Sequence, residues 1–211
     1  MSLVSIDSRG DGIAVVTLDR PKANAFSPEL IAELSEAFAS SEKARAVVLA
    51  SAMPGLFSAG WDLPILISRD RRGMEEFVSE YCGLVRQIFV FGPPVVAALN
   101  GHAIAGGLIV AMAADERIAA EGRGKFGLSE VILGVSVPQC LMEPFRHGIG
   151  ARAMERLAAT GENLSVERAL AVGLVDRAVP AESLLDAAVE RAGFLAGLSG
   201  PAYAAIKRRS R

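Results

Sequence analysis

The sequence predicts an α/β fold, and two observations support this class. Short apolar runs typical of buried strands, such as 46–50 and 94–99, are each followed by small residues and glycine, and then by a segment with helical spacing. This alternation of strand, turn and helix fills the first two-thirds of the chain, and the rest reads as mostly helical. Of the 211 residues, 51% are apolar, which is enough for the core of one domain, or of one domain with a short appendage.

The chain opens with a hairpin pattern. Residues 3–6 and 13–18 alternate as strands do, and a glycine-rich turn at 10–12 connects them. Ser27 is suited to cap a helix N-terminus, and Pro28 is suited to the first helical position. The apolar residues that follow recur with helical spacing: Leu30, Ile31, Leu34 and Phe38.

The later elements are assigned by the same patterns. Further strands are expected at 46–50, 94–99, 117–120 and 125–126, an amphipathic helix at 74–89, and helices at 152–159, 165–172 and 181–198. The sequence therefore divides into a core, residues 1–150, and a helical C-terminal region, residues 151–211. The charged runs at 69–72 and 207–211 are expected to be a solvated loop and a solvated tail.

The composition argues against several function classes. The formal net charge of −2 gives no broad basic surface for nucleic acid, and no run of about 18 apolar residues predicts a membrane span. Two cysteines without CxxC spacing and the absence of a signal-peptide pattern favour a reducing, cytoplasmic location. The two histidines, His102 and His147, lie far apart in the sequence, so no metal site is expected.

Two glycine turns, one in the segment 57–63 and one at 106–107, are the chemically suggestive part of the sequence. A helix N-terminus leaves backbone N–H groups without partners, and glycine lets a ligand approach them closely. Two such ends on neighbouring strands would aim the N–H groups of Trp61 and Gly106 at one point, which is an oxyanion hole for a carbonyl that gains negative charge. The alternative is that both glycine segments only form the tight turns of an α/β fold.

A candidate acid or base follows the second turn. Glu130 lies among apolar residues, so an inward side chain would have a raised pKa and would suit a general base. An outward carboxylate near a helix start is the equally plausible alternative. His102 is expected to be a packed or hydrogen-bonded structural histidine rather than a catalyst.

Five segments, in order, resemble the crotonase, or enoyl-CoA hydratase/isomerase, superfamily. They are LDRPKANAFS (18–27), FSAGWDL (57–63), NGHAIAGG (100–107), FGLSEVILGV (126–135) and TGENLSVERALAVGLVDRAVP (160–180). The resemblance implies a spiral of ββα units followed by a helical C-terminal region, and assembly as a homotrimer or a dimer of trimers. It also implies an acyl-coenzyme A substrate, without a further cofactor.

The resemblance also implies a set of site residues. The thioester oxygen would lie between the N–H groups of Trp61 and Gly106, and Glu130 matches a catalytic glutamate of the superfamily. The adenine and pantetheine of coenzyme A would line two segments, with Lys22, Ala23, Ala25, Ala59, Asp62 and Leu63 as the contributing residues.

Residue 109 departs from the pattern of the hydratases. Those enzymes carry a second glutamate after the second glycine turn, and this chain has Ile109 at the matching position. Addition of water requires both carboxylates, whereas shifting a double bond from β,γ to α,β requires one base and an oxyanion hole. The sequence therefore resembles the Δ3,Δ2-enoyl-CoA isomerase branch, and its GLSE form of the glutamate segment agrees with that branch.

Three alternatives stay open. The chain ends some tens of residues before the usual end of the superfamily, so the helices that cover the acyl pocket are expected to be shortened here. The protein is then an isomerase, another crotonase-type enzyme such as an enoyl-CoA hydratase or a thioester hydrolase, or a catalytically weak acyl-CoA binding protein.

Overall fold

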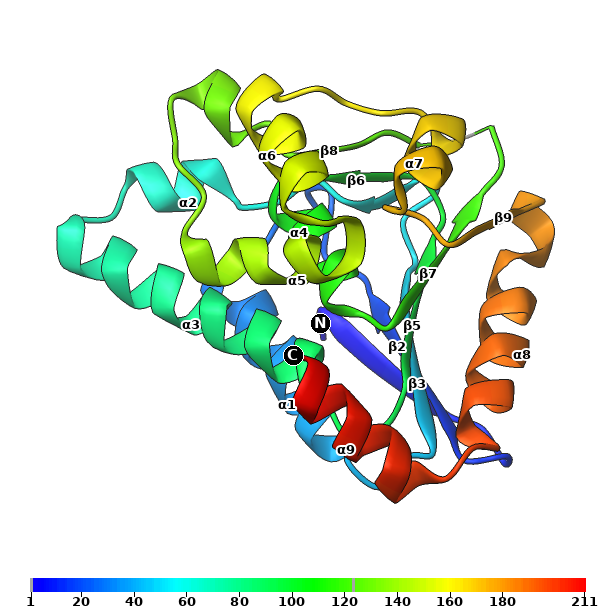
Figure 1. Cartoon of the computed structure of the whole chain (residues 1–211). Coiled ribbons are helices and arrows are strands. Elements are labelled where there is room, and N and C mark those ends of the chain that lie inside the picture. Colours follow the sequence, from blue (N-terminus) through cyan, green and yellow to red (C-terminus); the bar gives the residue numbers. More distant parts are fainter. Residues whose placement is uncertain (1, 123) are drawn as a thin grey trace.

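The computed structural model describes residues 2–122 and 124–211, and it confirms the α/β class (Figure 1). The strands are β1 (Val4–Ser8), β2 (Ile13–Leu18), β3 (Ala46–Ser51), β4 (Leu56–Ser58), β5 (Val95–Leu99), β6 (His102–Ile104), β7 (Glu116–Ala120), β8 (Phe126–Gly127) and β9 (Arg177–Val179). The helices are α1 (Pro28–Ser40), α2 (Leu63–Ile67), α3 (Arg71–Phe89), α4 (Gly106–Ala113), α5 (Gln139–Ile149), α6 (Ala151–Thr160), α7 (Val166–Val172), α8 (Leu184–Ala196) and α9 (Gly200–Ser210), with short 3-10 helices η1 (Glu130–Leu133) and η2 (Ala181–Ser183).

The strands form two sheets that the chain builds in alternation. The larger sheet has the order β1-β2-β3-β5-β7-β9, in which only the β1–β2 hairpin is antiparallel. The smaller sheet, β4-β6-β8, is parallel throughout. From β3 to β8 the chain places one strand in each sheet in turn, with helices between the pairs. This is the expected spiral of ββα units.

The smaller sheet corrects one sequence expectation. The glycine turns were assigned to the ends of the long strands, but they follow β4 and β6 instead. Each of these strands has three residues, too few for a period of two to stand out from a loop. The long strands thus give each unit its core, and the short strands place the turns.

Both faces of the larger sheet are buried along β2, β3, β5 and β7, whereas most of β1 is exposed. Along β2, Ile13 and Val15 join the apolar cluster that contains α8, whereas Ala14 and Val16 join the cluster that contains α1 and α3. Figure 1 shows α8 on one side of this sheet and α1 and α3 on the other. Parallel sheets covered on both faces read as continuous apolar runs, which explains why these strands were visible in the sequence.

The helix starts follow ordinary capping chemistry. The hydroxyl of Ser27 accepts the N–H of Leu30 (3.4 Å) at the start of α1, as expected. The carboxylate of Asp70 accepts the N–H of Gly73 (2.8 Å), so α3 begins at Arg71 rather than at residue 74. Arg71 and Arg72 are therefore helical, which corrects the expected loop at these two positions, whereas Asp70, Arg71 and Arg72 are exposed to solvent as expected.

The C-terminal segment also differs from its expectation. Lys207 on α9 is 4% exposed, and its ammonium lies 2.7 Å from the carboxylate of Asp115, between α4 and β7. Arg211 reaches the other oxygen of Asp115 at 3.0 Å. These contacts bury the two cations, so the prediction of a solvated tail at 207–211 was wrong at both positions. The division of the chain at residue 150 stays a prediction, although β9 from the later part joins the larger sheet beside β7.

Candidate active site

The two glycine turns meet at one end of the smaller sheet. Strands β4 and β6 are parallel neighbours, and each leads directly into its turn. Gly60 has φ 96°, which glycine adopts without strain, and a Cβ built on it would lie 3.0 Å from the amide nitrogen of Gly106. The backbone of the first turn therefore packs directly against the start of α4 in the second.

The main-chain N–H groups of Trp61 and Gly106 have no acceptor within residues 2–122 and 124–211. The bridge between Phe26 and Trp61 uses the groups on either side of Trp61, because the N–H of Phe26 donates to Gly60 O (2.7 Å) and the N–H of Asp62 donates to Phe26 O (2.9 Å). Gly106 is the first residue of α4, where an N–H has no partner within the helix. In the part of the chain that the structure describes, neither N–H donates to a protein group. Both are therefore free to bind one acceptor.

Ala105 holds the second turn in a strained conformation. Its backbone has φ 51° and ψ −126°, a region that residues other than glycine rarely adopt. Its N–H donates to the carbonyl of Gly127 (2.8 Å), and its carbonyl accepts the N–H of Ile109 (3.0 Å). Strain of this kind is typical of functional turns, where surrounding contacts fix one peptide orientation.

Glu130 supplies a half-buried carboxylate at the start of η1. Its Oε2 atom is enclosed, and no hydrogen-bond partner is found for it among the described residues. Burial raises the pKa of the Glu130 carboxyl above its usual value, and a hydrogen bond with its own main chain opposes the rise. Of the two orientations that the sequence allowed, the structure favours the inward one, which suits a general base.

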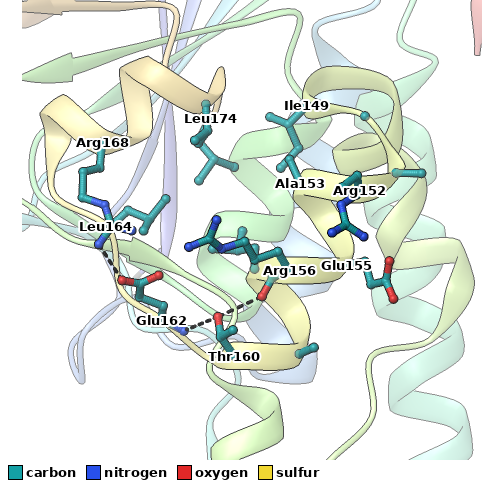
Figure 2. A pocket seen from close by; sticks show the side chains of 15 residues that line it. Ile149, Arg152, Ala153, Glu155, Arg156, Thr160, Glu162, Leu164, Arg168 and Leu174 are labelled. Carbon is teal, nitrogen blue, oxygen red and sulfur yellow. Dashed lines mark hydrogen bonds and ion pairs between the residues drawn. The ribbon is translucent and has the colours of Figure 1, made fainter.

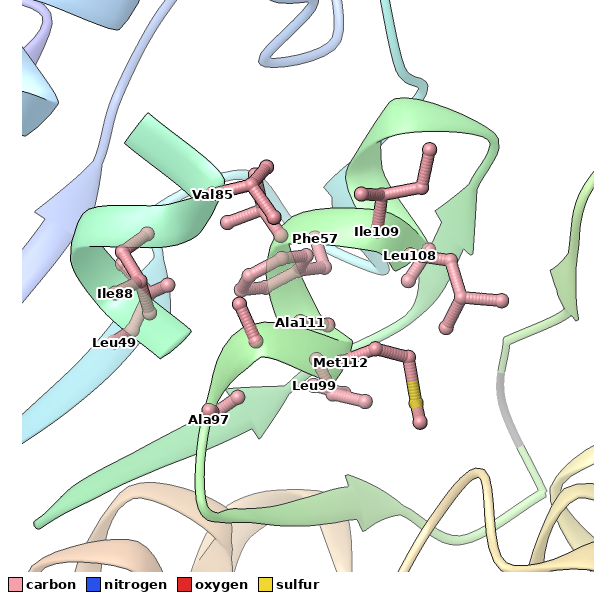
Figure 3. Packing of buried hydrophobic residues seen from close by; sticks show 14 of the residues in the cluster. Leu49, Phe57, Val85, Ile88, Ala97, Leu99, Leu108, Ile109, Ala111 and Met112 are labelled. Atoms are coloured by element: carbon pink, nitrogen blue, oxygen red, sulfur yellow. The ribbon is translucent and has the colours of Figure 1, made fainter. Parts of the chain in front are cut away.

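Residue 109 is part of the hydrophobic core. Ile109 is 1% exposed on α4, three residues after Gly106. Figure 3 shows it beside Leu108 on this helix, in the cluster that includes Phe57 and Val85. The position that carries a second glutamate in hydratases thus holds an alkane side chain that neither binds nor orients water.

The segment before α1 is an unusual left-handed loop. Lys22, Ala23 and Asn24 have φ values of 68°, 66° and 48°. The buried amide of Asn24 donates to Ser51 Oγ (2.8 Å) and to the carbonyl of Phe57 (3.0 Å), which fixes the loop against β3 and β4. The structure thereby brings together the two segments that the resemblance assigns to coenzyme A.

The individual residues of these segments differ in access. Lys22, Ala59 and Leu63 are exposed, Ala23 is half-buried and Ala25 is buried. The N–H of Ala59 donates to the carbonyl of Ala23 (3.1 Å), so the two segments share a backbone hydrogen bond.

Asp62 is bonded within the protein. Its carboxylate is 5% exposed and accepts a hydrogen bond of 2.5 Å from the guanidinium of Arg20, whose side chain is 10% exposed. The side chain of Asp62 therefore ties the first turn to the start of the left-handed loop. Sequence reasoning missed Arg20, because an arginine between a strand and a proline carries no signal of a partner 42 residues away.

Other sequence expectations have simpler outcomes. His102, expected to be packed, is exposed on β6. No cluster of three or more metal-ligating side chains is found among the described residues. Across residues 2–122 and 124–211, no helix combines the length and the apolar character needed to cross a bilayer.

Two apolar cavities lie near α6, away from the glycine turns. The larger, about 780 Å³, lies among α6, α7 and the end of α5, with the ion pair of Glu162 and Arg168 at its side (Figure 2). The smaller cavity has a volume of about 450 Å³, and its lining includes Val131, Met142 and Met154. Val131 directly follows Glu130 in the sequence. Neither cavity includes Trp61, Gly106 or Glu130 in its lining.

A spiral of ββα units whose paired turns offer two free N–H groups defines the crotonase fold class. Enoyl-CoA delta isomerase 1 from the mitochondria of Rattus norvegicus is 33% identical over 186 residues, which cover 86% of this chain and 64% of that protein. This chain thus spans just under two thirds of that relative. Carnitinyl-CoA dehydratase of Salmonella agona is 32% identical over 203 residues, covering 95% of this chain and 77% of the relative.

The solved structures give the same class. The human mitochondrial delta3-delta2-enoyl-CoA isomerase superposes with a TM-score of 0.95 at 31% identity, over 99% of this chain and 83% of that one. The family model for enoyl-CoA hydratase/isomerase matches residues 8–210. The chain therefore belongs to the enoyl-CoA hydratase/isomerase family.

Proposed function

We propose that this protein isomerises β,γ-unsaturated acyl-CoA to α,β-unsaturated acyl-CoA. Glu130 carries the proton, and the N–H groups of Trp61 and Gly106 hold the thioester oxygen. The observation that carries this proposal is the contrast between two positions: Glu130 is an enclosed carboxylate with an unpartnered oxygen, and Ile109 is a core residue. The similarity to two enoyl-CoA isomerases supports the same choice.

The reaction needs one base and no added atom. The ionised carboxylate of Glu130 removes a proton from Cα, and the electrons of that bond form a dienolate whose negative charge lies on the thioester oxygen. The N–H groups of Trp61 and Gly106 donate to this oxygen, and their stabilisation is largest when the charge is fully developed. Protonated Glu130 then returns the proton to Cγ, which leaves the double bond between Cα and Cβ.

Hydration is the less suitable reaction for this site. It needs a water molecule that one carboxylate deprotonates and a second carboxylate helps to orient. Ile109 offers no hydrogen bond, and its burial leaves no polar group at that position. One relative of this chain is a dehydratase, and dehydration is the reverse of hydration. That reaction also needs the second carboxylate, and this chain has Ile109 at the matching position.

The coenzyme A moiety is proposed to bind the exposed side of the left-handed loop and the first glycine turn. Lys22, Ala59 and Leu63 are exposed there, and Lys22 can pair with a phosphate group. Asp62 contributes through its main chain, because Arg20 engages its carboxylate. The homotrimer, or dimer of trimers, stays a prediction, as does the absence of a further cofactor.

An ultraviolet assay with two thioesters tests the reaction. Conjugation with the thioester makes an α,β-enoyl-CoA absorb distinctly, so isomerisation of a β,γ-enoyl-CoA raises the absorbance. We expect this rise with the β,γ substrate and no change with the α,β substrate. Glu130→Gln is expected to lower kcat by about 10²- to 10⁴-fold while acyl-CoA still binds.

Glu121→Gln is the matched control, because Glu121 is an exposed glutamate on the surface. It should leave kcat unchanged. A fall in absorbance with the α,β substrate would identify a hydratase and reject the single-base mechanism. Binding without turnover on either substrate would identify an acyl-CoA binding protein instead.

A further inference from the structure

Tyr81 on α3 lies beside both oxyanion donors, although nothing in the sequence pattern distinguished it from a core residue. Its side chain is fully buried, and its hydroxyl donates a 2.5 Å hydrogen bond to the carbonyl of Gly106. The bond reaches the first residue of α4 from a helix 25 positions earlier in the chain. It therefore restrains the residue whose N–H faces the proposed ligand.

Aromatic neighbours fix the ring of Tyr81. The ring meets Phe26 edge-to-face, with centroids 5.3 Å apart, and meets the indole of Trp61 in the same way at 5.4 Å. It stacks on Phe77 with an interplanar angle of 11°. Edge-to-face pairs of this kind favour one ring orientation, so the hydroxyl has a defined position.

The space around Gly106 is fully used by these side chains. A Cβ built on Gly106 would lie 2.8 Å from Cδ1 of Trp61 and 3.0 Å from the hydroxyl oxygen of Tyr81. Gly106 and Gly107 themselves carry no side chain that could restrict their backbone. The hydrogen bond from Tyr81 therefore adds an outside restraint to the first turn of α4, which the N–H of Ile109 and the carbonyl of Ala105 already close.

The hydroxyl of Tyr81 is held in its protonated form, in which it can donate a hydrogen bond. Burial raises the pKa of its hydroxyl well above the usual value, and the negative charge of Glu130 raises it further. The hydroxyl therefore keeps its proton while Glu130 is ionised. This protonation state suits the donation to the carbonyl of Gly106.

We propose that Tyr81 is a positioning residue of the oxyanion site, whose hydroxyl holds Gly106 so that its N–H points at the thioester oxygen. The inference rests on the proposed function only in that the Gly106 N–H binds this oxygen. If the hydroxyl of Tyr81 positions Gly106, removing it should reduce the polarisation of the bound thioester carbonyl. If Tyr81 only packs in the core, removing it should lower the stability of the protein and leave this polarisation unchanged.

Carbonyl polarisation can be measured without turnover. The probe is butyryl-CoA labelled with carbon-13 at the thioester carbonyl, whose NMR signal moves downfield when an oxyanion hole binds it. We expect Tyr81→Phe to keep the ring contacts, to lose roughly half or more of this displacement, and to lower kcat about tenfold with KM changed less than about threefold. Tyr203→Phe is the matched control, because Tyr203 is the only other tyrosine and lies on α9. It should leave the displacement unchanged.

The outcomes separate this inference from the proposed reaction. A full displacement in Tyr81→Phe would overturn the inference. A wild-type complex without displacement would reject the oxyanion site, and the inference with it. If the displacement depends on Tyr81 but no β,γ substrate is converted, the positioning role stands and the proposed reaction fails.

A second measurement applies if Tyr81→Phe does not fold. Tyr203→Phe protein grown with 3-fluorotyrosine carries its fluorine at position 81 alone, because the chain has two tyrosines. Butyryl-CoA should move this fluorine-19 signal, and coenzyme A without an acyl group should not. An unmoved signal with bound butyryl-CoA would contradict the inference.

Discussion

Two buried polar regions of this molecule are arranged in opposite ways. At the glycine turns, the N–H groups of Trp61 and Gly106 and one oxygen of Glu130 have no protein partner among the described residues. At the contact between α9 and β7, which we call the α9 latch, the carboxylate of Asp115 binds Lys207 and Arg211.

The polar groups of the α9 latch have hydrogen-bond partners within the protein. Asp115 also accepts the N–H of Val95 at 2.7 Å, and Arg211 donates to the carbonyl of Phe89 at 2.6 Å and lies over its ring. A buried polar group without a partner costs about 1–3 kcal/mol, so such groups persist mainly where a ligand satisfies them. The comparison therefore assigns binding to the turns and stability to the latch, and the following changes test that division.

Breaking the latch is expected to have the largest effect on stability. Asp115→Asn removes the charge that faces two buried cations, and loss of one partner of a buried ion pair costs about 3–5 kcal/mol. Urea unfolding should show a fall of this size, with kcat of the folded protein unchanged. Glu143→Gln is the control, because its ion pair with Arg146 is exposed and should change the free energy of unfolding by less than about 0.5 kcal/mol. Equal effects from both variants would refute the division.

The pH dependence of the latch gives the next largest effect. Burial lowers the pKa of Lys207 from 10.5 to about 8, despite the attraction of Asp115. Between these pH values the unfolded chain binds more protons at Lys207 than the folded chain, so this group makes stability rise with pH. Through this group, the free energy of unfolding rises by at most about 1.4 kcal/mol per pH unit.

Lys207→Met isolates this contribution. Urea unfolding at pH 7, 8 and 9 measures the free energy of unfolding of both proteins. The value for the wild type should rise with pH relative to the value for the variant. Other groups that titrate in this range, including Cys82, cancel in the difference. A constant difference would show that Lys207 keeps its ordinary pKa.

Replacing the Glu130 carboxylate should stabilise the protein while it lowers kcat. Glu130→Gln is expected to raise the free energy of unfolding at pH 7 by about 1–2 kcal/mol, because a buried charge is replaced by a neutral amide. The pKa of Glu130 is raised in the folded state, so its cost is present at neutral pH and disappears as the pH falls below 4.5. In the wild type, kcat/KM should rise with pH through the raised pKa, since the base must be ionised. Destabilisation by this variant would mean that Glu130 is a structural residue.

Relief of the strained turn is the smallest expected effect. Ala105→Gly removes a backbone strain of order 1–3 kcal/mol but adds conformational freedom to the unfolded chain, so we expect a net gain of roughly 0.5–1 kcal/mol. Thermal unfolding measures the gain, and kcat should fall because the turn loses rigidity. A loss of stability would show that contacts of the Ala105 methyl group outweigh the strain.

Periodicity explains which parts of the fold were predictable. The strands β2, β3 and β5 are buried on both faces, and α1 and α3 present one apolar side, so each leaves a clear pattern. Strands β4 and β6 have three residues each, and their apolar content merges with the turns that follow. Lys207 looked like part of a basic tail because its partner, Asp115, is 92 residues away.

The same reasoning applies to the candidate site. Trp61, Gly106 and Glu130 were proposed from the sequence because glycine turns and a lone carboxylate among apolar residues are local signals. Tyr81 and Arg20 were not, because their roles depend on single contacts between distant segments. Sequence patterns thus mark residues with local signals more readily than residues whose role depends on one contact with a distant segment.

The strand order of the larger sheet has a consequence for how the chain is made. Apart from the strands placed in the smaller sheet, its spatial order, β1-β2-β3-β5-β7-β9, is the order of synthesis. Each new strand can therefore pair with one that has already left the ribosome, and the growing sheet exposes a single advancing edge. Strand β9 and helix α9 follow the strands β1 to β8 in the sequence. The α9 latch can therefore form only after the rest of the spiral has been synthesised.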